Sequence, residues 1–243
     1  IKHRKAAVDK KRGKLWSKCS RAILAAARNG GGDPDSNLTL RYAIDEARYA
    51  NMPRDTIERL IKKAAGALDA DNFEVIRYEG YGPGGAAFLI EALTDNRTRT
   101  AGDVRLAFSK YGGNLGATGC VGNLFDQRGQ ITVPAAGVDG ERLMEAAVEA
   151  GAQDVEEPAD DSDEAAWVVM TAPVDFLRVK AALEKAGFTL GESRLEMIPQ
   201  TRVMASGEAA RDLIALVDAL DDLDDVQKVY ANFDVDEATL AAL

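Results

Sequence analysis

The first thirty residues constrain this chain most, because they combine helical periodicity with almost unmixed positive charge. Residues 2–28 hold ten Lys and Arg and a single acid, Asp9. Apolar side chains, among them Leu15, Cys19 and Ile23, recur at steps that place them on one face of a helix. Gly13 weakens the prediction that one unbroken helix covers the segment. We therefore expect a helix that buries one face and carries cations on another.

The cations of this segment form the candidate binding surface. A second helical row, on a different side from the apolar residues, runs through Lys11, Lys14, Lys18, Arg21 and Arg28. Such a row is either a solvated charged face or a surface that follows a phosphate backbone, and the near absence of acids favours the second reading. The candidate nucleic-acid-binding residues are Lys2, His3, Arg4, Lys5, Lys10, Lys11, Arg12, Lys14, Lys18, Arg21 and Arg28, with Arg54, Lys62, Lys63, Arg97 and Arg99 as secondary candidates.

Charge is divided unevenly along the chain. Residues 1–65 hold 16 Lys and Arg against 7 Asp and Glu, whereas the remainder holds 14 against 33, which gives the net charge of −10. The acidic remainder would repel a polyanion and so leave the basic segment as the point of contact. At 243 residues and 46% hydrophobic content, the chain is large enough to bury more than one core.

The order of the predicted elements gives the fold class. Three helices are expected in the first 70 residues, because glycines and capping residues separate three apolar periodic segments. Residues 131–199 show a β-α-β-β-α-β pattern, which is the ferredoxin-like order. The strands, helix and loops between 73 and 130 lack a closing helix and strand, and those predicted at 208–220 and 226–232 would supply them. Just before the ferredoxin-like region, a turn is expected at 127–129, between short strands at 124–125 and 130–133.

The sequence therefore predicts an α+β protein with three domains. The first is a three-helix basic domain at 1–70. The second is a discontinuous α/β domain at 71–130 plus 203–243, and the third is a ferredoxin-like α/β domain at 131–202, inserted in the second.

Catalytic motifs are scarce. His3 is the only histidine, which excludes His-based triads and His-rich metal clusters, and no P-loop pattern occurs. Cys19 and Cys120 lie far apart, which argues against a disulfide framework and fits a reducing cytoplasm. No apolar run of about 18 residues is present, so a membrane span is not expected. We expect neither an enzyme nor a cofactor or metal.

Three local features leave a binding role open. The backbone of Gly82–Gly85 could approach a phosphate, but its place between two strands favours a hairpin turn. Asp95 or Asn96 is expected to cap a helix, which we favour over a phosphate contact by the nearby arginines. Trp16 is expected to be a partly buried anchor, with stacking on a base as the alternative.

Several short motifs give the chain a resemblance to the YebC/PmpR family, which includes the mitochondrial translational activator of cytochrome c oxidase. They follow in the family's order over nearly the whole chain: Ile1–Lys5, Asp9–Lys14, Gly30–Pro34, Asn51–Pro53, Gly82–Gly85, Asp95–Arg99 and Gly112–Gly116. The resemblance implies a helical N-terminal domain and two α/β domains around a cavity. It also implies a cytoplasmic regulator without enzymatic activity.

The resemblance leaves the physiological target open. It implies either a DNA-binding transcriptional regulator or a translation factor that acts on ribosomes stalled at proline-rich sequences. The expected partner is therefore nucleic acid, as promoter DNA or as ribosomal RNA. The three predicted helices lack a clear recognition helix with base-reading side chains, which weakens sequence-specific DNA binding. A third reading is a protein-interaction adaptor whose acidic domains bind a basic partner.

Overall fold

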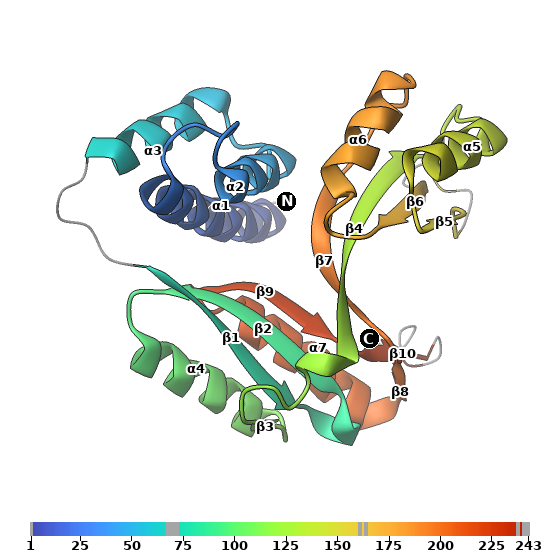
Figure 1. Cartoon of the computed structure of the whole chain (residues 1–243). Coiled ribbons are helices and arrows are strands. Elements are labelled where there is room, and N and C mark those ends of the chain that lie inside the picture. The colour runs from blue at the N-terminus through green and yellow to red at the C-terminus, as the bar shows by residue number, and fades with distance from the viewer. Residues whose placement is uncertain (1, 67–72, 160–161, 163–164, 237–238, 240–243) are drawn as a thin grey trace. The chain divides into compact units, whose positions relative to one another are not determined.

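The computed structural model describes the chain except for residues 1, 67–72, 160–161, 163–164, 237–238 and 240–243 (Figure 1). The side chains of residues 2–11, 65 and 66 also lie outside the description. Two compact units result: one contains residues 1–124 and 199–243, and the other contains residues 125–198. The predicted domain boundaries at 70, 131 and 202 stay predictions.

The first unit begins with the three predicted helices, α1 (Lys2–Gly30), α2 (Leu38–Tyr49) and α3 (Arg54–Gly66). Asn37 begins α2 as a buried N-cap, because its side chain accepts from the Leu40 N–H at 3.1 Å and donates to the Ala26 carbonyl at 2.8 Å. Helix α1 continues through Gly13, where a Cβ would meet nothing within 4 Å. The unbroken helix, which the glycine had made doubtful, is therefore present.

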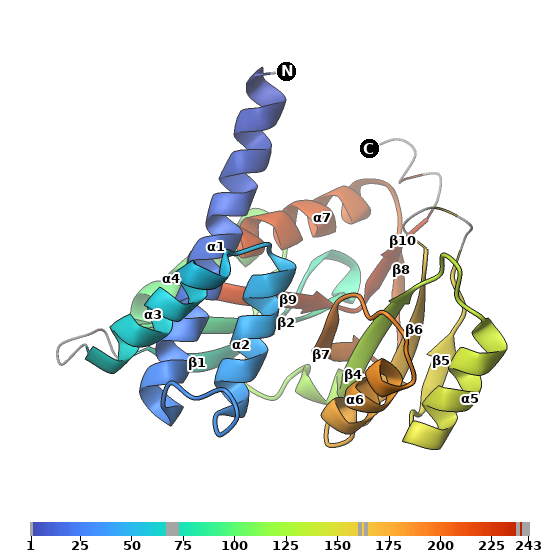
Figure 2. The same ribbon diagram turned by 90° about the horizontal axis from the view of Figure 1, so that it is seen from above.

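The buried face of α1 starts later than its apolar pattern suggests. Cys19 and Ile23 belong to the core of the three helices, but Leu15 is 48% exposed. The neighbouring Trp16 packs against this core instead, and in Figure 2 the first turns of α1 extend past α2 and α3. The prediction that Leu15 lies in the core is wrong.

The rest of the first unit is an antiparallel sheet of strand order β3-β1-β2-β9, with α4 (Arg97–Lys110) and α7 (Gly207–Asp221) on one face (Figure 1). Phe88, Phe108 and Leu216 are fully buried between the strands and these helices. The segment after the second unit closes this sheet, because β9 pairs with β2. The strands are β1 (Glu74–Tyr81), β2 (Ala87–Thr94), β3 (Asn114–Leu115) and β9 (Val226–Ala231), and the short β8 (Val203–Ala205) and β10 (Phe233–Val235) pair in parallel.

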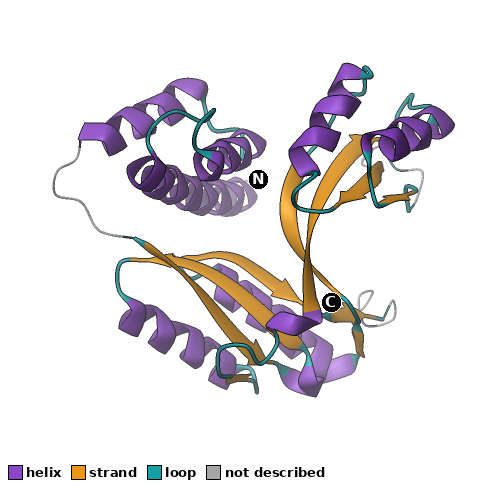
Figure 3. Cartoon of the chain, in the orientation of Figure 1, coloured by secondary structure: helices purple, strands orange, loops and turns teal. Residues whose placement is uncertain are grey.

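The second unit has the predicted β-α-β-β-α-β order, with the strands arranged β5-β6-β4-β7. Its two helices lie on the same side of the sheet, as Figure 3 shows. The bounds are β4 (Phe125–Pro134), α5 (Gly140–Ala150), β5 (Asp154–Glu156), β6 (Ala166–Thr171), α6 (Phe176–Lys185) and β7 (Ser193–Pro199).

The predicted turn at 127–129 is wrong, because β4 is one continuous strand. Gly129 pairs with Thr171 inside the β4–β6 ladder. A Cβ at Gly129 would collide with the side chains of Thr171 and Phe176. The glycine therefore allows α6 to pack closely on the strand, which is a common role of glycine within strands. The described elements confirm the predicted α+β class with a helical N-terminal region.

Candidate nucleic-acid interface

The basic segment forms the N-terminal part of α1. The backbone of residues 2–11 is helical, whereas the side chains of Lys2, His3, Arg4, Lys5, Lys10 and Lys11 lie outside the description. Arg12 is exposed, and its guanidinium lies 6.0 Å from the centre of the Trp16 ring. Trp16 is half-buried and donates from Nε1 to the Ala50 carbonyl at 2.9 Å. The predicted anchoring role of Trp16 is confirmed, and its stacking on a base stays a prediction.

The next three cations of the row meet an acidic segment that begins at the last residue of α7 and ends just before β9, Asp221-Asp222-Leu223-Asp224-Asp225. We call this the Asp221–Asp225 segment. Lys14 Nζ lies 2.6 Å from Asp222 Oδ1, and Lys18 Nζ lies 2.8 Å from Asp221 Oδ1. Arg21 Nη1 lies 2.8 Å from Asp225 Oδ1. The cations were expected to face outward, and the structure instead pairs these three within the chain.

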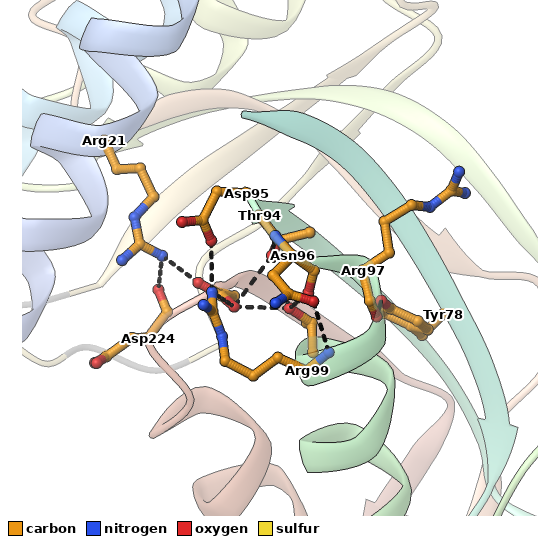
Figure 4. A network of polar contacts seen from close by, with 10 residues as sticks. Arg21, Tyr78, Thr94, Asp95, Asn96, Arg97, Arg99 and Asp224 are labelled. Atoms are coloured by element: carbon orange, nitrogen blue, oxygen red, sulfur yellow. Dashed lines mark hydrogen bonds and ion pairs between the residues drawn. The ribbon is translucent and has the colours of Figure 1, made fainter. Parts of the chain in front are cut away.

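Asp225 is the buried centre of this contact. Its side chain is 9% exposed and binds Arg21 through one oxygen and Arg99 through the other, with Arg99 Nη2 at 2.7 Å from Oδ2. The hydroxyls of Thr94 and Thr100 also donate to Oδ2, at 3.2 and 2.7 Å. In Figure 4, Arg21 and Arg99 approach this network from different elements, whereas the side chain of Arg97 points away from it.

The protonation of Asp225 follows from this environment. Burial raises the pKa of its carboxyl, but hydrogen bonds from Arg99 and Thr100 and the charges of Arg99 and Arg21 outweigh burial, so the pKa falls below its usual range. The Asp225 and Asp95 carboxylates in turn raise the pKa of Arg99. Asp225 is therefore a carboxylate held between two permanent cations.

The secondary candidates do not form one surface. Arg99 is taken up by the Asp225 network, Arg97 lies 3.5 Å from Glu74, and Arg54 pairs with Glu58 at 2.8 Å. Lys62 and Lys63 are exposed on α3. Arg28 is half-buried in the last turn of α1, where a cation favours the helix dipole. Among the secondary candidates, the two lysines are therefore exposed, whereas the three arginines lie beside carboxylates of the chain.

The motifs near Arg97 and Gly82 have structural roles. Asn96 is the N-cap of α4, since its side chain accepts from the Arg99 N–H at 3.0 Å. The Gly82–Gly85 segment is the hairpin turn between β1 and β2, and it forms a short 3₁₀ helix in which Gly84 has φ 69°. Both favoured readings are confirmed.

A loop that is rich in backbone N–H groups binds a carboxylate of the chain itself. Glu79, which is 7% exposed, accepts from the N–H groups of Gly119, Val121 and Gly122 at 2.9, 2.7 and 2.8 Å. Burial raises the pKa of Glu79, but these three hydrogen bonds and the charge of Arg77 lower it below its usual value. The anion bound by these backbone N–H groups is therefore the carboxylate of Glu79, which stabilises the loop.

Sequence reasoning missed the Asp221–Asp225 segment, although four aspartates in five residues are visible in the printed sequence. Only the three-dimensional structure brings it to α1, about 200 residues away in the chain. Within the described residues, no group of three or more His, Cys, Asp or Glu side chains has a geometry suited to a metal ion. None of the described helices combines the length and apolar character of a membrane span.

Comparison with known proteins gives the relationship of the whole chain. Residues 1–67 match the N-terminal domain of the TACO1/YebC protein family, and residues 73–233 match its second and third domain. The chain belongs to the TACO1/YebC family. The resemblance seen in the sequence motifs is confirmed.

The curated TACO1/YebC relatives carry a regulatory name. A probable transcriptional regulatory protein of Geotalea uraniireducens is 51% identical, over 98% of this chain and 94% of the relative. Another with the same description, from Paraburkholderia phymatum, is 52% identical over 96% of this chain and 94% of the relative. The names of these relatives support a role as a regulator.

A solved structure has the same fold. The crystal structure of a conserved hypothetical protein from Aquifex aeolicus superimposes with a TM-score of 0.81 and 47% sequence identity. The superimposed region covers 95% of this chain and 93% of the Aquifex aeolicus protein. The TACO1/YebC architecture therefore extends over nearly all of both proteins.

Proposed function

We propose that the protein is a non-enzymatic, cytoplasmic, nucleic-acid-binding regulator of gene expression, of the DNA-binding transcriptional type. The regulatory names of the full-length relatives support the proposal. The concentration of positive charge in residues 1–65, against an acidic remainder, supports nucleic acid as the partner.

One observation carries the proposal, namely that Lys14, Lys18 and Arg21 act together as an anion-binding row. They occupy positions i, i+4 and i+7 of α1, and each binds oxygen atoms of one continuous acidic segment. At a rise of about 1.5 Å per residue the row spans roughly 10 Å of helix. That length matches about three base-pair steps of a DNA strand, at roughly 3.4 Å each. Three cations within this length can contact phosphates of one short stretch of strand.

Further cations lie elsewhere in the helical region. The helix continues for several turns past the core of the three helices, toward the basic residues 2–11 (Figure 2). Lys62 and Lys63 add exposed cations on α3. The sequence-independent attraction of such a surface to phosphates supplies most of non-specific nucleic-acid binding.

A second candidate is a translation factor that binds ribosomal RNA, for ribosomes stalled at proline-rich sequences. Helices α2 and α3 contain no Asn or Gln, and the exposed face of α3 mixes acids with bases. The Asn and Gln side chains that read adenine in the major groove are therefore missing from these two helices, which favours a target recognised by its shape and backbone.

A side-by-side titration tests the proposal and separates the two targets. The full chain is titrated at physiological salt against random duplex DNA, its own upstream promoter DNA and intact ribosomes. Tighter binding to the promoter than to random DNA supports the transcriptional regulator. Preference for ribosomes, with weak and salt-sensitive DNA binding, supports the translation factor. Absence of binding to all three contradicts the proposal.

A further inference from the structure

The end of helix α7 breaks a general rule of helix stability. Its last turn contains no basic residue, and Asp221 and Asp222 place two negative charges at the negative end of the helix dipole. Such residues weaken an isolated helix end. A local feature that conflicts with stability is a mark of a functional role.

The cations of α1 compensate for this charge. Lys18 Nζ donates to the Asp221 carbonyl at 2.7 Å as well as to its carboxylate, and Arg21 Nη1 donates to the Asp224 carbonyl at 2.5 Å. Lys14 Nζ lies 3.4 Å from the Asp222 carbonyl. The Lys18 side chain keeps only 11% of its surface exposed. The row of cations is therefore occupied by oxygen atoms of the chain itself.

We propose that the Asp221–Asp225 segment is an internal competitor of phosphate, which holds the α1 row in a closed, autoinhibited state until nucleic acid displaces it. This inference rests on the proposed function, since it assumes that the row binds phosphates. Carboxylate and carbonyl oxygens take the positions that phosphate oxygens would need. The same ammonium and guanidinium groups cannot bind both at once.

The two outer ion pairs of the contact, at Asp221 and Asp222, suit a reversible closure. Asp221 and Asp222 have side chains that are 63% and 72% exposed, and ion pairs with such exposed partners are weak. A polyanion with many phosphates can therefore displace them. Asp225 differs, because Arg99, Thr94 and Thr100 hold it on the sheet and α4 independently of α1. The acidic segment thus keeps its place when α1 leaves it.

The apparent affinity for nucleic acid equals the affinity of the open state multiplied by the fraction of molecules that are open, so a closed state lowers it.

The test compares wild-type protein with the double variant D221N/D222N in a titration against a random 20-base-pair duplex. The variant D103N/E208Q is the matched control, since it removes two negative charges at exposed positions of α4 and α7. Because amides keep the shape of the side chains, all three proteins are expected to fold.

The proposal predicts that D221N/D222N binds the duplex about threefold to tenfold more tightly than wild type, the range expected for two exposed ion pairs. The control is expected to bind like wild type. Salt weakens the internal ion pairs as well as the phosphate contacts, so the affinity of the variant should also fall more steeply with salt than that of wild type.

Two results overturn the inference in different ways. Equal affinity of D221N/D222N and wild type, or an equal gain in the control, shows that the acidic segment does not compete and leaves the proposed function standing. Failure of all three proteins to bind the duplex or any other nucleic acid contradicts the proposed function, and the inference falls with it.

Discussion

Lys18 and Asp221 are separated by 203 residues in the chain, yet Lys18 Nζ lies 2.8 Å from Asp221 Oδ1 and 2.7 Å from the carbonyl oxygen of the same residue. The contact joins the most basic helix to the most acidic helix end. It shows that the phosphate-binding row predicted from the sequence has an anionic partner inside the molecule. The consequences for stability and binding can be tested separately.

Replacement of Asp225 tests the buried centre of the contact. Asp225→Ala leaves Arg21 and Arg99 without their shared carboxylate and removes an acceptor of the Thr94 and Thr100 hydroxyls. We expect the free energy of unfolding to fall by about 2 kcal/mol in urea denaturation. The exposed Asp222 provides the comparison, and Asp222→Ala should cost less than about 1 kcal/mol. Equal effects of the two changes would contradict a central role for Asp225.

Acid should destabilise the protein partly through Asp225. A carboxyl whose pKa is lower in the folded state stabilises the fold above its unfolded-state pKa, about 3.9 for Asp. That stability is lost as the pH falls through the lower, folded-state pKa. Wild type should therefore lose more unfolding free energy than Asp225→Asn on going from neutral pH to about pH 3. Parallel stability curves for the two proteins would show that Asp225 has an ordinary pKa.

Glu79 should stabilise the loop of residues 116–122. Glu79→Gln replaces one carboxylate oxygen by an NH2 group, which cannot accept a hydrogen bond from the backbone N–H groups of Gly119, Val121 and Gly122. We expect a loss of about 1–3 kcal/mol in unfolding free energy. The amides of these three residues should also exchange hydrogen faster in the variant. Unchanged exchange at these amides would show that the carboxylate does not organise the loop.

Two glycine substitutions should have opposite effects. Gly129→Ala forces a methyl group against Thr171 and Phe176, and we expect it to destabilise the protein by about 1–3 kcal/mol. Gly102 lies exposed on α4, and a Cβ there meets nothing within 4 Å. Gly102→Ala should therefore stabilise the protein by up to about 1 kcal/mol. Thermal unfolding of both variants beside wild type checks the signs, and a stabilised Gly129→Ala would contradict the close packing of α6.

Much of the fold could be predicted because the local signals agree with it. Asn96, one of the two expected caps, is the N-cap of α4, and α1, α2 and α3 follow the three apolar periodic segments. The errors have physical reasons. Leu15 fits the apolar period, but its neighbour Trp16 packs against the core of the three helices and Leu15 stays 48% exposed. Gly129 looks like a turn residue but makes room for Phe176.

The candidate site could be predicted only in part. The row of Lys14, Lys18 and Arg21 follows from helical spacing, which is local information. The partner at Asp221–Asp225 depends on how the chain returns to α1 after the second unit, which no local pattern records. An aspartate pair at a helix C-terminus is the one signal in the sequence that could have indicated it, because it conflicts with the helix dipole.

The salt dependence of DNA binding by Lys14→Gln/Lys18→Gln tests the central claim most directly. Affinity for a random duplex is measured from low to physiological salt for wild type, for this variant and for Lys110→Gln/Lys185→Gln, which removes two exposed cations elsewhere. If the row binds phosphates, the variant binds more weakly and its slope of log K against log salt is shallower than that of wild type by up to about 0.9 per lost contact. The control should follow wild type. Equal slopes and affinities for the variant and wild type would contradict the account.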